Sequence, residues 1–303
     1  MGTCASMGHE TLLRIPRKLG GSRVSLEHDV RTRYEIQSQI GRGVRSTVYH
    51  ARDKIEKMDV ALKCIEISYY GMGNIDDIQR EIDLCASIEH DRIVRIHRVM
   101  ETAEHVYIAY EYALHGDLNL GTESDLAERI ELARFTARHI GLALRFLHSE
   151  AIVHRDVKLD NILWCGPRVL KLCDFNMAER CEDREHKRCA PGDRLLGTFE
   201  YMAPEYMQTF VSTPSNDMWA LGVTLYTLIA REFPYDSELV RKRRPEVFVH
   251  PPAYDPCIWN SVPRPLAKIV QYLLEPDPVC RWTARDVTCD EWVFEKSRRH
   301  AKM

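Results

Sequence analysis

The sequence predicts an α+β protein of two lobes, a small β-sheet lobe followed by a larger helical lobe. Its 303 residues are enough for about two structural units at ~150 residues each. Hydrophobic residues make up 45% and charged residues 29%, which is a globular composition rather than a disordered or fibrous one. Strand-like stretches fill the chain up to about residue 112, and helical periodicity dominates after that point.

The small lobe, residues 34–112, is predicted from alternating and β-branched runs. Residues 76–88 predict one helix, because Ile78, Ile82 and Cys85 recur on one face. We therefore expect a small sheet with a single helix. The strand-like stretches are 34–40, 47–52, 60–67, 93–100 and 106–110.

The large lobe, residues 113–294, is predicted to be helical. Apolar residues keep helical spacing over 126–150, and residues 265–274 form a further amphipathic stretch. Residues 217–231 are nearly all apolar, which predicts a helix buried on every side. We expect residues 1–33 to be a flexible tail, because Gly, Pro and Ser are scattered through them, and residues 295–303 to be a basic tail.

Charge and hydropathy exclude several classes of protein. The net charge of −3 provides no basic field that would attract nucleic acid. The apolar run 221–230 is about half as long as a bilayer span requires. The N-terminus lacks the apolar region of a secretion signal, so we expect a cytoplasmic protein.

The ten cysteines are expected to be reduced thiols, because nothing in the sequence directs the chain to an oxidising compartment. No Cys-x-x-Cys spacing occurs, which disfavours a structural zinc site. Cys181 and Cys189 could cross-link an exposed loop, but in a reducing cell free thiols are favoured.

A glycine-rich turn lies between the first two predicted strands, in the stretch Ile40–Val48. Gly41 and Gly43 would let the backbone close over phosphate groups, where a Cβ atom would collide. Thr47 and Val48 favour a strand after the turn, so the loop is a hairpin and not the strand-to-helix turn of a dinucleotide-binding fold. A short Gly-x-Gly is often a plain hairpin turn, and by itself it proves no function.

A lysine and a glutamate form a second candidate pair. Lys63 ends the third strand-like run, and Glu81 lies on the predicted helix that follows. A lysine that faces a binding site needs an acid to hold its side chain, and Glu81 can supply it. Taken singly, each residue is better explained as an ordinary surface charge.

The stretch His154–Asn161 carries the strongest signal. Asn161 and Asp174 offer two oxygen ligands of the kind that Mg²⁺ prefers. Asp156 is a separate carboxylate that can accept a hydroxyl proton, and Lys158 can neutralise a phosphoryl group in transfer. Any one of these residues could belong to a polar loop, but their occurrence together in this order by chance is very improbable.

With these motifs, the chain resembles the eukaryotic protein kinases over residues 34–292, nearly all of the part expected to be ordered. Further matches are Ala-Pro-Glu at 203–205, Asp-x-Trp-x-x-Gly at 217–222, and Arg281 in the stretch PDPVCRW. The resemblance implies a two-lobed kinase fold. It also implies that Glu205 pairs with Arg281 and that Asp217 holds the backbone of the catalytic loop.

The resemblance implies ATP and Mg²⁺ as cofactors. Lys63, held by Glu81, would bind the α- and β-phosphates, Asn161 and Asp174 would bind Mg²⁺, and Tyr110 would be the gatekeeper residue. The residues implied to cover the nucleotide or contact adenine are Ile40, Gly41, Gly43, Val48, Ala61, Glu111, Ala113 and Leu163.

Lys158 and the stretch 197–205 resemble the serine/threonine branch, and the ending PDPVCRW resembles its calmodulin-dependent group with the checkpoint kinases. In that branch Thr198 would hydrogen-bond Asp156 and Lys158. Asp117 and Asp160 would favour protein substrates with an arginine upstream of the Ser or Thr acceptor. The activity implied is transfer of the ATP γ-phosphoryl group to Ser or Thr of protein substrates.

Two positions depart from the family pattern. Ser46 stands where the third glycine of the loop is usual, which many active members tolerate. Asn176 replaces the glycine of Asp-Phe-Gly, and we expect Asn to serve there because it tolerates a left-handed backbone. Two alternatives stay open, a catalytically weak scaffold and a small-molecule kinase of related fold.

Regulation is predicted from what the segment Asp174–Glu205 lacks. Its only hydroxyl side chains are Thr198 and Tyr201, so the usual phosphorylation site has no acceptor. Arg155, which precedes Asp156, would normally pair with that phosphate. We expect a permanently charged acid, Asp193 above all, to take the place of the missing phosphate beside Arg155. We also expect a regulatory partner protein to raise the activity further. The candidate acids are Glu179, Glu182, Asp183, Glu185 and Asp193.

Two short motifs bear on localisation. Gly2 with Ser6 fits the myristoylation pattern, and Cys4 could take a palmitoyl group, which would give membrane association. The run 241–244 (Arg-Lys-Arg-Arg) could be a nuclear signal or docking patch, but a solvated charged face is the favoured interpretation. Short motifs of both kinds often match by accident.

Overall fold

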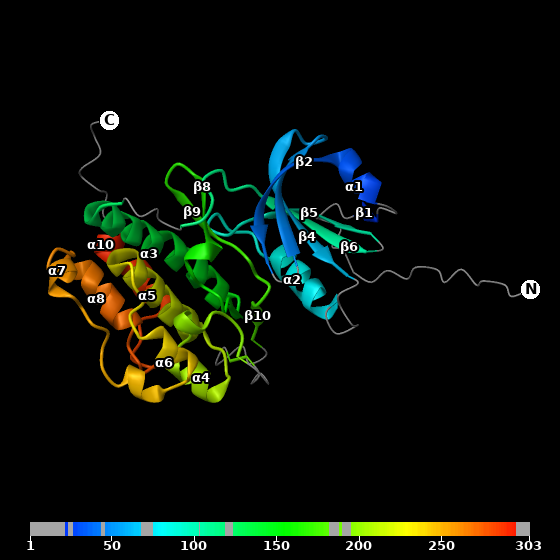
Figure 1. Ribbon diagram of the computed structural model, residues 1–303. Helices are drawn as coiled ribbons and strands as arrows, with labels where there is room; N and C mark the ends of the chain where they lie inside the picture. The colour runs from blue at the N-terminus through cyan, green and yellow to red at the C-terminus, as the bar shows by residue number, and fades with distance from the viewer. Residues whose placement is uncertain are drawn as a thin grey trace, which may run out of the picture. The chain divides into compact units, whose positions relative to one another are not determined.

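The computed structural model describes residues 22–23, 27–43, 46–67, 75–102, 104–118, 124–181, 188–189 and 195–294. The chain divides into two compact units. The first contains the described residues up to Glu89 together with Val94–Tyr112, and the second contains His90–Ile93 and the residues from Ala113 onward. A β-sheet dominates the first unit and helices dominate the second (Figure 1), as the sequence predicts.

The first unit is built on a six-stranded sheet in the order β1-β5-β6-β4-β3-β2. Neighbouring strands from β2 to β6 are antiparallel, and only β1 pairs in parallel, with β5. Each predicted strand is present, with bounds shifted by a few residues. The strands are β1 (Ser22–Arg23), β2 (Tyr34–Arg42), β3 (Ser46–Asp53), β4 (Met58–Glu66), β5 (Ile96–Glu101) and β6 (His105–Glu111).

In the described part of this unit there are two helices, α1 (Glu27–Arg33) and α2 (Ile75–Ser87), where the sequence predicted one. Helix α2 is the predicted amphipathic helix. Helix α1 and strand β1 lie in the stretch predicted to be a flexible tail, so that prediction is wrong for residues 22–23 and 27–33. Strand β1 pairs with β5, and α1 is fastened to the sheet by the contacts described next.

Helix α1 is held by contacts at its carboxyl end. Arg33 pairs with Asp53 at 2.7 Å, and the Lys54 side chain donates to the Arg31 carbonyl at 2.7 Å. Asp53 also accepts from the amides of Ile55 and Glu56. Burial alone would raise the pKa of Asp53, but these donors and Arg33 outweigh it, so its pKa lies below the ordinary value.

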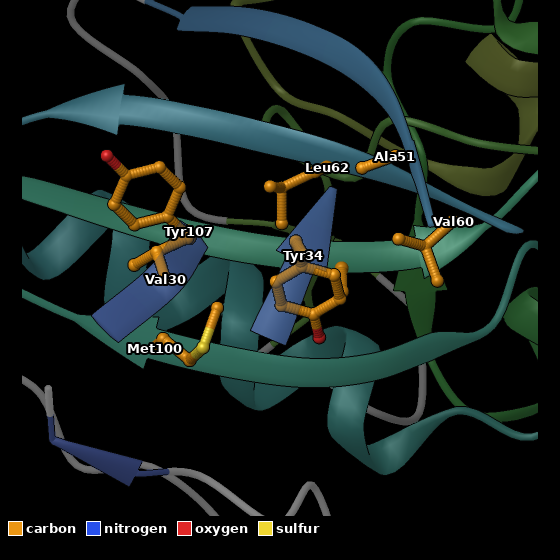
Figure 2. Packing of buried hydrophobic residues seen from close by; sticks show 8 residues of the cluster. Val30, Tyr34, Ala51, Val60, Leu62, Met100 and Tyr107 are labelled. Carbon is orange, nitrogen blue, oxygen red and sulfur yellow. The ribbon is translucent and has the colours of Figure 1, made fainter. Parts of the chain in front are cut away.

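One hydrophobic cluster of the first unit forms where α1 meets the sheet (Figure 2). Val30 of α1 and Tyr34 at the start of β2 are each 1% exposed. Both gather with residues from β3, β4, β5 and β6, and Figure 2 shows the Tyr34 ring among these strands. At about 25 cal/mol per Å² of apolar area removed from water, this burial gives α1 a stabilising role. The cluster is Val30, Tyr34, Ala51, Val60, Leu62, Met100, Tyr107 and Ala109.

The second unit is mainly helical (Figure 1). Its two long helices, α3 and α5, contact each other, and α5 is buried on nearly every side as predicted. Gly222 on α5 lets α8 approach, since a Cβ there would lie 2.8 Å from the Leu273 Cβ. The helices are α3 (Leu126–Ser149), α4 (Pro204–Thr209), α5 (Pro214–Ala230), α6 (Ser237–Arg241), α7 (Pro256–Trp259), α8 (Arg264–Leu273), α9 (Ala284–Cys289) and α10 (Glu291–Phe294).

Two short β-ribbons complete this unit and carry its polar loops. Strand β8 (Ile162–Gly166) pairs with β9 (Val169–Leu172), and β7 (Ile152–Val153) pairs with β10 (Glu179–Arg180). The loop after β7 contains a 3₁₀ turn, Leu159–Asn161, and leads directly into β8. Within the described residues, none of the helices combines the length and the apolar character needed to cross a bilayer.

Candidate active site

In the first unit, Lys63 and Glu81 form a close ion pair. Lys63 lies on β4 and Glu81 on α2, and Lys63 Nζ is 2.7 Å from Glu81 Oε1. Their side chains are 12% and 5% exposed, so water screens the pair only weakly. The Tyr110 hydroxyl on β6 donates to the same Glu81 oxygen at 2.7 Å. The predicted pair is therefore present, and a third residue supports it.

The glycine-rich stretch is a hairpin between β2 and β3, as predicted. Gly41 lies opposite Val48, and the Gly43 amide donates to the Ser46 carbonyl at 2.8 Å. Ile40 falls at an irregularity in the β2–β3 register, and its side chain is 48% exposed. A Cβ on Gly43 would lie 3.1 Å from Ser46 Oγ, so the serine at the third glycine position packs against the turn.

The remaining residues predicted to contact adenine are half-buried. Ala61 lies on β4 opposite Tyr110, and Glu111 ends β6 with its amide donating to the Arg95 carbonyl at 2.8 Å. Ala113 follows in the second unit, and Leu163 lies there on β8.

In the second unit, Asp156 is the centre of a hydrogen-bond cluster and is 7% exposed. Lys158 Nζ lies 2.8 Å from Asp156 Oδ2. The Thr198 hydroxyl donates to Asp156 Oδ1 at 3.1 Å, and the Thr198 amide donates to the same oxygen at 3.2 Å. Lys158 also donates to the Thr198 hydroxyl at 2.9 Å. These contacts confirm the predicted bonds of Thr198.

The Asn161 amide is oriented by Asp156. Asn161 Nδ2 donates to the Asp156 carbonyl at 2.7 Å and to its Oδ2 at 2.9 Å. Because both bonds engage the nitrogen, Oδ1 is left as the acceptor side of the amide. Asp174 adds a carboxylate on a left-handed backbone, with φ of 60°. An amide oxygen and a carboxylate are a donor set suited to Mg²⁺.

The tolerance of Asn176 for a left-handed backbone is not used in this structure. Among the described residues, Asp174 has a positive φ and Asn176 does not. Asn176 therefore occupies the glycine position of the motif without adopting the backbone that would favour glycine. Phe175, between them, is 3% exposed and meets the His154 ring edge-on at 4.9 Å between centroids.

Asp217 on α5 holds the loop that contains Asp156, as predicted. Its two oxygens accept from the amides of His154 and Arg155, each at 2.9 Å. His148 on α3 lies 2.9 Å from Asp217 Oδ2, a contact that the sequence analysis missed because nothing local marks this histidine. Burial by itself would raise the pKa of Asp217. The hydrogen bond from His148 and the other nearby donors lower it by more than burial raises it, so the pKa lies below its usual value.

Gly197 sets the approach of Thr198 to Asp156. Its φ is +105°, and a Cβ there would lie 2.6 Å from the Arg155 carbonyl oxygen. A side chain would therefore push Thr198 away from the aspartate. The sequence analysis included Gly197 only within a longer motif, although a glycine directly before a site residue is the signal for such a contact.

Arg155 has a carboxylate partner, Glu179, which is one of the predicted candidate acids but not the favoured one. Arg155 Nη1 lies 2.6 Å from Glu179 Oε2, and its Nε donates to the Met177 carbonyl. The favoured candidate, Asp193, and the acids at 182, 183 and 185 lie outside the described residues. Glu179 contacts Arg155 because β10, which contains Glu179, pairs with β7, and the loop that carries Arg155 follows β7 directly.

Asp117 and Asp160, predicted to bind substrate, are both exposed. Asp117 lies opposite Leu163 of β8, because residues 115–118 run along that strand and hydrogen-bond to it. Asp160 lies in the 3₁₀ turn near Tyr201. Burial and the charge of Asp160 raise the pKa of Tyr201.

The predicted Glu205–Arg281 pair is confirmed. The two side chains make a bidentate contact at 2.6 and 2.9 Å, and Asn216 donates to Glu205 at 2.7 Å. Arg281 is 3% exposed and also lies over the Trp219 ring at 4.9 Å. This contact fixes the start of α4, directly after the segment with Thr198, to α5.

Comparison with known proteins agrees with this geometry. The chain is 31% identical to serine/threonine-protein kinase kin-29 of Caenorhabditis elegans over 91% of its length and 32% of that protein. It is 30% identical to the human NUAK family SNF1-like kinase 2 over 88% of its length and 41% of that protein. It is 31% identical to CBL-interacting protein kinase 5 of Oryza sativa subsp. japonica over 89% of its length and 58% of that protein.

The chain spans a third to three fifths of the length of these relatives. The part that they share with this chain contains the Lys63–Glu81 pair and the hydrogen-bond cluster around Asp156. Residues 34–293 match the protein kinase domain, a region that includes every site residue from Ile40 to Arg281. This chain belongs to the protein kinase domain family.

Proposed function

We propose that the protein is a serine/threonine protein kinase that transfers the γ-phosphoryl group of ATP to a Ser or Thr hydroxyl of protein substrates. The observation that carries the proposal is the contact of Asp156 with both Lys158 and Thr198. It places a carboxylate, a cation and a hydroxyl around one point, which suits an acceptor hydroxyl and a phosphoryl group. The names of relatives such as kin-29 support the serine/threonine branch.

Residues of the first unit are assigned to the nucleotide. Lys63 binds the α- and β-phosphates, and Glu81 keeps its ammonium group in place. The hairpin at Gly41 and Gly43 covers the phosphates, because backbone without side chains can approach them closely. The backbone of Glu111 and Ala113 is assigned to adenine hydrogen bonds, with apolar contacts from Ile40, Val48, Ala61 and Leu163.

Asn161 and Asp174 are assigned to Mg²⁺. When bound, the cation supplies charge neutralisation for the phosphate oxygens. The chain contributes the orientation of its ligands. Asp156 keeps the Asn161 nitrogen turned toward itself, which presents the oxygen to the cation. The Phe175 ring packs edge-on against His154, and this packing restrains the position of the neighbouring Asp174.

Asp156 receives the proton of the acceptor hydroxyl. The acceptor oxygen forms a bond to the γ-phosphorus while the bond from that phosphorus to the β–γ bridging oxygen breaks, which leaves ADP. Lys158 lies beside Asp156 and stabilises the charge that develops on the phosphoryl oxygens. Positioning and electrostatics supply most of the rate in this class of reaction.

The test compares the wild type with Asp156→Asn in a magnesium-dependent assay of phosphate transfer from ATP to a peptide library. We expect Asp156→Asn to lose at least about 1,000-fold in kcat while nucleotide binding persists. Binding of ATP by the wild type without transfer would instead identify a scaffold. Transfer only to members of a metabolite panel, run beside the peptides, would identify a small-molecule kinase.

The substrate is proposed to carry an arginine upstream of the acceptor. Asp117 and Asp160 are exposed acids, and two carboxylates suit a bidentate guanidinium contact. Changing both to alanine should raise KM for Arg-containing peptides by about tenfold or more and leave Arg-free peptides unaffected. An equal loss for both kinds of peptide would contradict this assignment.

Membrane or nuclear localisation remains a proposal. Gly2, Cys4 and Ser6 lie outside the described residues. The run 241–244 is exposed, but Arg241 pairs with Glu200 and Lys242 with Glu238, which supports the reading as a charged surface of the fold. Fractionation of cells that express wild type or Gly2→Ala tests the acyl anchor, and a soluble wild type would exclude it.

A further inference from the structure

Two cysteine thiols lie in direct contact within the segment that follows Asp174. Cys181 Sγ and Cys189 Sγ are 3.3 Å apart, and each residue is 2% exposed. The sequence analysis expected these cysteines on an exposed loop, and the structure corrects this. Both belong to a buried cluster with Ala151 and Val153.

Backbone hydrogen bonds hold the two cysteines in this contact. The Cys181 amide donates to the Ala151 carbonyl at 2.7 Å, just after the end of β10. The Cys189 amide donates to the Ser212 carbonyl at 3.0 Å, just before α5. Both positions are therefore tied to fixed parts of the second unit, and the contact does not depend on the two side chains alone.

We propose that Cys181 and Cys189 are a redox modification site that forms a reversible intramolecular disulfide when the protein meets hydrogen peroxide. A disulfide needs the sulfurs at about 2.05 Å, so a short movement from their present contact is sufficient. The residues are eight positions apart in sequence, and the bond would close the loop between them.

The reaction balances with peroxide as the oxidant. The Cys181 sulfur attacks one peroxide oxygen, the O–O bond breaks, and a sulfenic acid and one water form. The Cys189 sulfur then attacks the sulfenic sulfur, the S–O bond breaks, and a second water leaves. Overall, two thiols and one H₂O₂ give one disulfide and two waters, and a dithiol reductant reverses the change.

The contact also assigns the order of attack. The hydrogen bond with Cys189 lowers the pKa of the Cys181 thiol, which makes it the better nucleophile. The same contact, together with burial, raises the pKa of Cys189. Since both thiols are buried, peroxide reaches them through local opening of this segment, and the reaction should be slower than that of an exposed thiolate.

The disulfide would stabilise the segment next to the catalytic loop. Glu179, which pairs with Arg155, lies two residues before Cys181. A cross-link at Cys181 restrains the chain directly after this ion pair. We expect the oxidised protein to keep its phosphate-transfer activity and to gain about 5 °C in melting temperature, from the entropy of closing a short loop.

Peptide mapping tests the proposal on the unmodified protein. Arg180, Arg184, Arg188 and Arg194 place each cysteine on its own short tryptic peptide, 181–184 and 189–194. After treatment with peroxide and alkylation of remaining thiols, we expect the two peptides as one linked species, about 2 Da lighter than their sum. Dithiothreitol should separate them. Unlinked peptides in the treated protein would overturn the proposal.

Variants provide the matched control. Cys257 is an exposed cysteine on α7, so Cys257→Ser should keep both the linked peptide and the gain in melting temperature. Cys181→Ala should lose both. Oxidation confined to the exposed cysteines, or a sulfinic acid at Cys181 with Cys189 still reduced, would show that the buried contact is not the site.

Discussion

The Tyr110 hydroxyl and Lys63 Nζ both contact Glu81 Oε1, each at 2.7 Å. Tyr110 lies on β6 and Glu81 on α2, so this hydrogen bond ties the sheet of the first unit to its helix independently of the lysine. The family resemblance assigns Tyr110 to the gatekeeper position. Its hydroxyl makes it, in addition, a positioning residue for the ion pair that holds Lys63.

We predict that Tyr110→Phe weakens nucleotide use. A hydrogen bond to a charged group contributes about 1.5–3 kcal/mol, and part of this loss should reach Lys63 through Glu81. KM for ATP should rise by about three- to tenfold, with a smaller change in KM for peptide. Steady-state kinetics with both substrates varied measures this. Tyr272→Phe, an exposed tyrosine on α8, is the control, and equal effects of the two changes would contradict the role of Tyr110.

We predict that Thr198→Val lowers kcat by about tenfold or more. The hydroxyl receives a hydrogen bond from Lys158 and donates one to Asp156, and valine can do neither. Thr198→Ser keeps the hydroxyl and should retain most of the activity. Single-turnover rates of the two variants make the comparison. If serine and valine are equally harmful, the packing of the side chain matters and not its hydrogen bonds.

We predict that Glu179, and not Asp193, supplies the charge that orders the segment beside Arg155. The two side chains are 2.6 Å apart, with Arg155 10% and Glu179 32% exposed. Protein made in bacteria and treated with phosphatase should be active. In this background Glu179→Gln should lower kcat/KM by about tenfold, because a charge-assisted hydrogen bond is lost. Asp193→Asn is the control, and the reverse pattern would restore the original assignment.

We predict that stability falls as the pH drops below about 6.5 because of His139. Burial, together with the charges of Arg92 and Arg138, lowers the pKa of His139 from 6.5 to about 3. Its Nδ1 accepts the Leu170 amide at 3.2 Å, so the folded state holds the neutral ring. The unfolded state therefore binds more protons between pH 6.5 and about 3, and stability is lost as the pH falls through this range.

Between pH 7.5 and 5.5 this histidine should cost about 1 kcal/mol of unfolding free energy. Urea unfolding at the two pH values measures the change. His139→Gln removes the titrating group and should flatten the dependence. His250, an exposed histidine, is the control, and His250→Gln should leave the dependence as in the wild type. A dependence that survives His139→Gln would assign the effect to another group.

Much of the site could be predicted because its chemistry is local in sequence. Asp156, Lys158 and Asn161 lie within six residues, and a short loop places them together whatever surrounds it. The same holds for the Gly41–Gly43 hairpin, whose turn follows from backbone freedom. Of the pairs that are distant in sequence, Lys63–Glu81 was offered as a candidate pair from the residues themselves, and Glu205–Arg281 was implied by the resemblance. The structure confirms both.

Helix α1 shows why other elements could not be predicted. Among its seven residues, Val30 is the one aliphatic side chain, so no periodicity marks the helix. Its stability comes from burial of Val30 against the sheet and from the Arg33–Asp53 pair. Both contacts join residues that are distant along the chain, and local propensity contains no information on them.

The sequence by itself determined the order of strands β2 to β6 and of helices α2, α3, α5 and α8, the burial of α5 and the chemical groups of the site, because hydrophobic period and residue type are local properties. Only the tertiary structure decided which acid meets Arg155, which residue carries the left-handed backbone near Asn176, and whether Cys181 meets Cys189. These contacts depend on how β7 and β10 pair and on the space that the packed helices leave for the loops between them. The physical reason is that the free energy of such contacts comes from packing between elements, which no single segment specifies.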